Sequence, residues 1–129
     1  MATTSRVRPN VVALVRIVIR LAFIVNLLLG LYIWTGRGDS LIPLHEAVGI
    51  VLVLGLATQI VFGILARLTP GLIVAAIAIG LVVPILGDRQ ADIVPGDLHW
   101  IVQSIHLLLA VALIAVAESL ARRLMSRSR

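Results

Sequence analysis

Residues 97–110 read DLHWIVQSIHLLLA, a short polar turn that runs into a long apolar helix. Two histidines, His99 and His106, lie in this stretch with Gln103 between them. At about 100° per residue, seven residues return almost to the same helical face, so the two imidazoles stand roughly 10 Å apart along the axis. Ionisable side chains within membrane-spanning runs are rare and mark functional sites. The third histidine, His45, opens another apolar run, so we expect all three imidazoles at one end of a bundle.

The composition predicts a membrane protein. Of 129 residues, 60% are hydrophobic and 13% are charged, and the mean hydropathy is +1.13, outside the range of soluble globular domains. The formal charge of +5 comes from arginines beside apolar runs, a distribution typical of membrane topology and not of nucleic-acid binding. The absence of cysteine excludes disulfides, thiolate metal sites and a cysteine-ligated haem. Because Arg16 and Arg20 interrupt the first apolar run and no small-x-small cleavage site follows, we expect this run to stay as the first span.

Four apolar segments predict helices at about residues 11–35, 42–67, 72–86 and 96–124. Their short connections require antiparallel neighbours, so the predicted fold class is an all-α membrane protein, a four-transmembrane-helix antiparallel bundle that forms one domain over residues 1–129. We expect Pro84 to end or kink the third helix and Asp97 to cap the fourth helix or lie in its first turn. Arg16 and Arg20 lie one turn apart and are expected to extend toward the lipid headgroups.

The arginines predict the orientation of the bundle. Arg37 and Arg89 fall on one side of the predicted membrane, and the other nine fall on the opposite side. Because short cytoplasmic segments carry an excess of basic residues, both termini are expected to be cytoplasmic. The acidic residues are consistent with this orientation, since Glu118 is the only one near the predicted inner side. The three histidines then belong to the outer half of the membrane.

Histidines on facing helices are suited to hold a haem iron in a bundle core. A neutral imidazole offers one nitrogen lone pair to the metal, while its other N–H is held by an acceptor. Gly49 follows His45 by one turn and Ala110 follows His106 by one turn, and such small residues would admit a flat porphyrin. Depth in the membrane favours His45 with His99 as the ligand pair, whereas the local residues favour His45 with His106. Gln59 and Gln103 are candidates for hydrogen bonds to the ligands or for bonds between helices.

The motifs LHEAVG at residues 44–49 and IHLLLA at residues 105–110 resemble one four-helix half of the haem A synthases, and more loosely other transmembrane b-type cytochromes. In the synthases each half carries one histidine on its second helix and one on its fourth, at a spacing similar to the 61 positions from His45 to His106. The resemblance implies haem b (iron) as cofactor with these two histidines as axial ligands, electron transfer or haem handling near the outer face, and a bacterial or archaeal cytoplasmic membrane. The family has two fused halves, in many members with a cysteine pair, whereas this chain has one half and no cysteine. Residues 41–44, before His45, hold no acid where family members carry one. A homodimer would restore eight helices, and a quinol or a redox protein would be the partner.

Other interpretations of the same residues stay open. His99 beside Trp100 fits an interfacial aromatic belt, so it is either an outer-edge residue or an alternative ligand. His45, His99, Glu46 and Asp97 have ligand types that suit zinc. Four short helices could also form a small transporter, although coupled transport usually needs an acid at mid-membrane. A structural or assembly subunit of a respiratory complex is a further alternative, and the sequence does not decide whether the chain is an enzyme.

Overall fold

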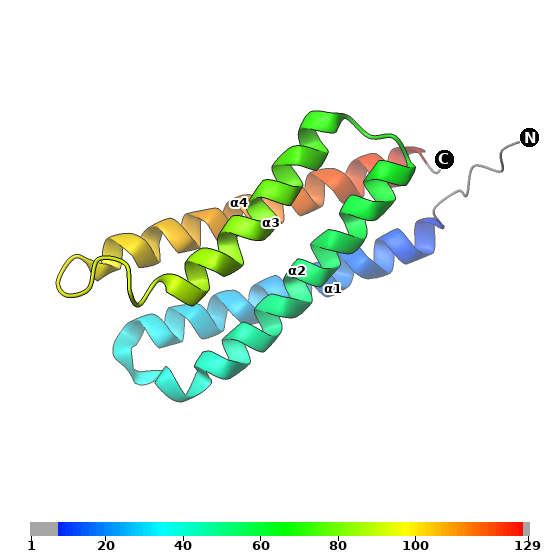
Figure 1. The fold of residues 1–129 in the computed structure, drawn as a ribbon. Helices are drawn as coiled ribbons and strands as arrows, with labels where there is room; N and C mark the ends of the chain where they lie inside the picture. The colour runs from blue at the N-terminus through cyan, green and yellow to red at the C-terminus, as the bar shows by residue number, and fades with distance from the viewer. Residues whose placement is uncertain (1–7, 128–129) are drawn as a thin grey trace, which may run out of the picture.

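The computed structural model describes residues 8–127, which fold into a bundle of four helices (Figure 1). These are α1 (Pro9–Tyr32), α2 (Ile42–Leu65), α3 (Pro70–Arg89) and α4 (His99–Arg127). A π-helical turn, η1 (Ile33–Arg37), and a 3-10 turn, η2 (Asp39–Leu41), connect α1 to α2. Each of the four helices is long and apolar enough to cross a membrane. The predicted all-α, multi-pass architecture is therefore confirmed.

The helices run alternately up and down, and each packs against the next in the chain (Figure 1). α1 also packs against α4, so the four helices close a ring. We call one end of the bundle the terminal end, because α1 begins there and α4 ends there, beside the α2–α3 turn at residues 66–69. The opposite end is the loop end, formed by residues 33–41 and 90–98.

Two predicted helix boundaries are wrong in an instructive way. α3 does not stop near residue 86, because it continues through Pro84 to Arg89. A proline removes one backbone hydrogen bond, but a broken helix in hydrocarbon would leave several polar groups unpaired, so continuation is favoured. α4 begins at His99 and has no acid in its first turn, so Asp97 lies in the preceding turn and not at the cap. Gly96 at φ 90° and Val94 at φ 51° keep this segment out of the helical conformation.

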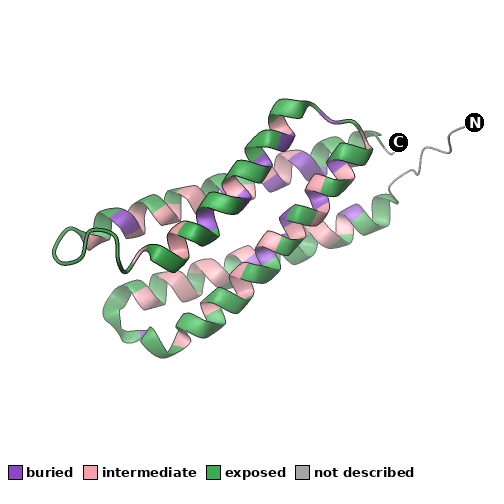
Figure 2. Ribbon diagram, viewed as in Figure 1, coloured by how far each residue is buried: buried purple, intermediate pink, exposed green. Residues whose placement is uncertain are grey.

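The packed core lies toward the terminal end of the bundle, as the purple segments in Figure 2 show. Its fully buried residues on α4 are concentrated between Leu113 and Leu124. Between Val102 and Leu113, α4 has no buried residue. α1 likewise has none after Ala22, and α2 has none before Leu52. Side chains therefore fill the half near the terminal end and leave the half near the loop end incompletely filled.

Glycine permits close helix packing in the filled half. A Cβ on Gly55 of α2 would lie 2.6 Å from Cγ1 of Ile19 on α1, and a Cβ on Gly63 would lie 2.6 Å from Cδ1 of Ile73 on α3. On α3, Ala76 is fully buried and Gly80 packs near Leu56. The small-residue packing predicted for the third helix is therefore present, and α2 uses it as well.

Replacing Gly55 by valine is expected to lower the free energy of unfolding by about 1–3 kcal/mol, because the new methyl groups overlap with Ile19. Denaturation in detergent, followed by loss of helical circular dichroism, measures the change. Ala57→Val on the same helix is the control, since Ala57 is exposed. Equal stability of the two variants would contradict the close contact of α1 with α2.

Arg16 and Arg20 differ from the expectation that both extend toward the headgroups. Both guanidinium groups bind the carboxylate of Glu118 on α4, with Arg16 Nη2 at 2.6 Å from Oε2 and Arg20 Nε at 2.7 Å from Oε1. Glu118 lies at the same depth on the neighbouring helix, so the arginines find a partner within the protein. This three-residue cluster ties α1 to α4.

Candidate functional site

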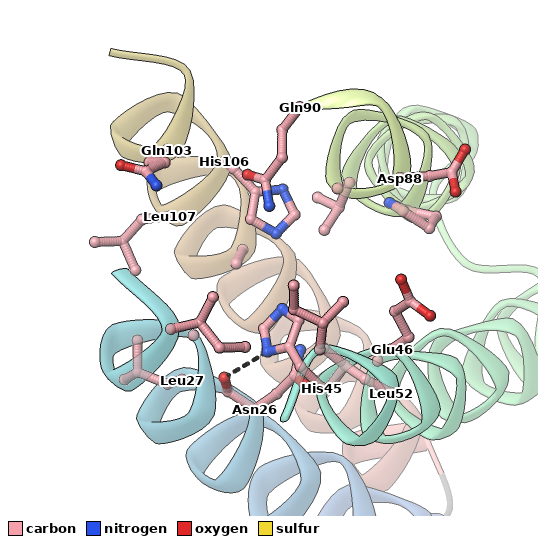
Figure 3. Close-up of a pocket in the computed structure, with 18 of the residues that line it drawn as sticks. Asn26, Leu27, His45, Glu46, Leu52, Asp88, Gln90, Gln103, His106 and Leu107 are labelled. Carbon is pink, nitrogen blue, oxygen red and sulfur yellow. Dashed lines mark hydrogen bonds between the residues drawn. The ribbon is translucent and has the colours of Figure 1, made fainter. Parts of the chain in front are cut away.

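A cavity of about 560 Å³ lies between the helices in the half nearer the loop end. This volume is within the range of small-molecule and cofactor sites. Its walls are mainly apolar, with contributions from residues such as Leu27, Leu52 and Leu107 (Figure 3). The polar side chains that line it are Asn26, His45, Glu46, Asp88, Gln90, Gln103 and His106.

His45 is half-buried in the first turns of α2, and its imidazole is held by α1. Its Nδ1 lies 3.1 Å from the backbone carbonyl oxygen of Asn26, the contact drawn as a dashed line in Figure 3. A carbonyl oxygen only accepts hydrogen bonds, so Nδ1 carries the hydrogen and Nε2 keeps a free lone pair. The same arrangement, with one ring nitrogen on a backbone carbonyl, orients histidines that bind metals.

Gly30 has no side chain and so leaves room for the imidazole of His45 beside α1. Gly30 follows Asn26 by one helical turn, and a Cβ there would lie 3.1 Å from Cε1 of His45. Any larger side chain at this position would press the imidazole away from α1 and from the Asn26 carbonyl. The glycine is therefore part of the site although it carries no functional group.

His106 enters the cavity from α4, on the opposite side from His45 (Figure 3). Its Nδ1 is buried and has no hydrogen-bond partner among residues 8–127. A Cβ on Gly87 of α3 would lie 3.0 Å from Cε1 of His106, so this imidazole also packs against a glycine of the neighbouring helix. A buried ring nitrogen without a partner is costly, which makes this residue a candidate for binding a ligand.

The structure brings together His45 and His106 and leaves His99 outside the cavity. His99 lies in the first turn of α4, two turns nearer the loop end than His106, and its Nδ1 is buried without a partner in the described chain. All three imidazoles therefore lie in the half of the bundle nearer the loop end, as expected, but His99 does not share the cavity of the other two. Depth along the helices suggested the pairing of His45 with His99, but the cavity contacts α4 at Gln103 and His106 and does not extend to His99.

The other predicted site residues are also placed by the structure. Gly49, Ala110 and Gln103 all line the cavity, as the sequence predicted. Gln59 does not, because it is fully buried in the packed half, where neither polar atom of its side chain has a hydrogen-bond partner within residues 8–127. The zinc site proposed for His45, His99, Glu46 and Asp97 is not assembled, since the described residues contain no group of three or more such ligands suited to hold a metal ion.

Three parts of the site were missed by reasoning from the sequence. They are the backbone carbonyl of Asn26 and the two glycines Gly30 and Gly87, all on helices that carry no histidine in the cavity. The only sign of these parts in the sequence was Asn26, a lone asparagine in the first apolar run. It suggested a role for the asparagine side chain, whereas the structure uses its backbone carbonyl. Comparison of the chain with protein-family models, with curated proteins and with solved structures finds no match.

Proposed function

We propose that this chain is a membrane cytochrome that binds haem b in the cavity, with His45 and His106 as the two axial ligands of the iron. The observation that carries the proposal is the entry of two imidazoles from α2 and α4 into one largely apolar cavity (Figure 3). A porphyrin supplies four of the ligands of its iron, so two histidines suffice and no cluster of three protein ligands is needed. The resemblance of residues 44–49 and 105–110 to one half of the haem A synthases is a second reason for this proposal.

The residues present fit such a group in three respects. The hydrogen bond of His45 to Asn26 leaves Nε2 available to a metal, and His106 has a buried ring nitrogen without a protein partner. Leucine side chains would cover the faces of a porphyrin and exclude water. The space beside Gly49 is open, because a Cβ there would meet only Nδ2 of Asn26, at an ordinary contact distance of 3.6 Å.

A bound haem would supply reversible one-electron chemistry. The two histidines would occupy both axial positions, which favours electron transfer over binding of small molecules. Trp34 and Gln90 line the cavity near the loop end, so an electron donor or acceptor such as a quinol or a redox protein would approach there. The arginine count supports an outward orientation of this end. The resemblance to the haem A synthases is the reason that we propose a bacterial or archaeal cytoplasmic membrane. A homodimer would place two such sites in one eight-helix assembly.

An absorption spectrum of the purified protein tests the proposal. Protein made in cells supplied with a haem precursor is expected to show the split reduced bands of a six-coordinate haem b. Pyridine haemochrome analysis should give one haem per chain, because the cavity offers one pair of histidines. A colourless preparation that also fails to bind added haemin would overturn the proposed function.

A further inference from the structure

The cluster of Arg16, Arg20 and Glu118, which we call the arginine site, holds more positive charge than its carboxylate can neutralise. Arg16 donates from Nε and Nη2 to Glu118, and Arg20 donates from the same two atoms. Two guanidinium groups thus share one carboxylate, which leaves one positive charge in excess. These bonds do not use the Nη1 atom of either arginine.

The arginine site lies within the apolar part of the bundle. α3 has 20 residues, so its length of about 30 Å matches the hydrocarbon layer, and the α2–α3 turn marks the boundary at the terminal end. Arg123 reaches Thr69 in that turn at 3.1 Å. Glu118 precedes Arg123 by five residues on α4, so it lies about 7–8 Å deeper. An uncompensated cation at this depth is costly unless an anion reaches it.

The arginine site is open to the surroundings of the bundle. The side chain of Arg20 is 50% exposed and that of Arg16 is 23% exposed, whereas Glu118 is 16% exposed. Glu118 is the only acid near the terminal end, because the other five acids of the sequence lie at or near the loop end. Among residues 8–127, no second carboxylate side chain is therefore near the two arginines. In a membrane, the nearest anions are the phosphate groups of lipids, which lie just outside the hydrocarbon boundary. A phosphate reaches Arg20 when the headgroup is drawn inward beside α1, the local thinning by which bilayers accommodate charged side chains.

We propose that the arginine site binds the headgroup phosphate of an anionic phospholipid. Arg20, the more exposed cation, contacts the phosphate, and Arg16 adds to the attraction from the side of the bundle. Glu118 holds both guanidinium groups in one place between α1 and α4, so that they present a preformed surface. This site lies in the packed half of the bundle, away from the histidine cavity, and does not depend on haem.

Full-length protein in nanodiscs tests the proposal, with phosphatidylcholine alone or with one part in five of phosphatidylglycerol. Native mass spectrometry counts the lipids that stay bound to the released protein. The wild type should retain phosphatidylglycerol in preference to phosphatidylcholine, and Arg20→Gln should reduce that preference about fivefold, the effect of one basic residue near an anionic surface. Arg8→Gln is the matched control, because it removes the same charge at the start of α1 outside the cluster.

A second variant separates lipid binding from a purely structural ion pair. Glu118→Gln leaves both arginines without a carboxylate, so its thermal midpoint should fall in phosphatidylcholine and recover with phosphatidylglycerol by more than the wild type gains. No recovery would show that the cluster only joins two helices. Stabilisation of the phosphatidylcholine sample by inorganic phosphate alone would assign the site to free phosphate. Equal retention of both lipids by the wild type would overturn the proposal even if a variant failed to fold.

Discussion

Replacing His106 by alanine is expected to abolish the split reduced bands of six-coordinate haem in the purified protein, while His99→Ala keeps them. The reason is the placement of the two side chains, since His106 lines the cavity opposite His45 and His99 does not line it. The two residues lie on the same helix, so they form a matched pair of variants. Absorption spectra of the reduced proteins at equal haem and protein concentrations measure the difference.

Carbon monoxide gives a second measurement for the same variants. If His45 and His106 both bind the iron, as we propose, the reduced wild-type protein should not bind carbon monoxide. His106→Ala retains only His45, so any haem that stays bound should acquire a carbon monoxide difference spectrum. Loss of the bands in His99→Ala with retention in His106→Ala would instead identify His45 and His99 as the ligands. Unchanged bands in both variants would exclude His106 as a ligand.

Replacing Gly87 by valine is expected to weaken haem binding by about 10- to 100-fold, the range found for residues that orient metal ligands. A Cβ at this position would lie 3.0 Å from Cε1 and 3.6 Å from Nε2 of His106, so the larger side chain must displace the imidazole. Titration of the haem-free protein with haemin, followed by absorbance, gives the affinity.

Gly71→Val provides the control on the same helix, because a Cβ on Gly71 meets no atom within 4 Å. Circular dichroism should show the same helix content for both variants, so that a difference in haem affinity reports on His106. Equal affinities for Gly87→Val and Gly71→Val would contradict a ligand role for His106 in the position described.

The four long helices could be predicted from the sequence, whereas the π-helical and 3-10 turns between α1 and α2 were not. Long apolar runs separated by short polar or tight turns have one stable form in a membrane, because a helix pairs all its backbone groups internally. The predicted starts of the second and third helices, residues 42 and 72, lie within two residues of the observed starts of α2 and α3. The end of α3 was wrong, since Pro84 breaks helices in water more readily than in a membrane. The histidines of the cavity were found because ionisable groups are conspicuous in an aliphatic background.

The pattern of residues was enough to predict an all-α chain with four apolar helices and to identify His45 and His106 as candidate ligands. Three features could be seen only after the helices were packed together: His99 lies outside the cavity, the Asn26 carbonyl holds His45, and Glu118 binds two arginines. The contacts of Asn26 and Glu118 join different helices, and they depend on how far each helix is rotated about its own axis. The position of His99 depends instead on where the cavity ends along α4. In a membrane protein both the lipid-facing and the core-facing sides are apolar, so hydropathy does not reveal that rotation. The rotation of the helices is set instead by close packing at glycines, such as Gly55 against Ile19 and Gly87 against His106.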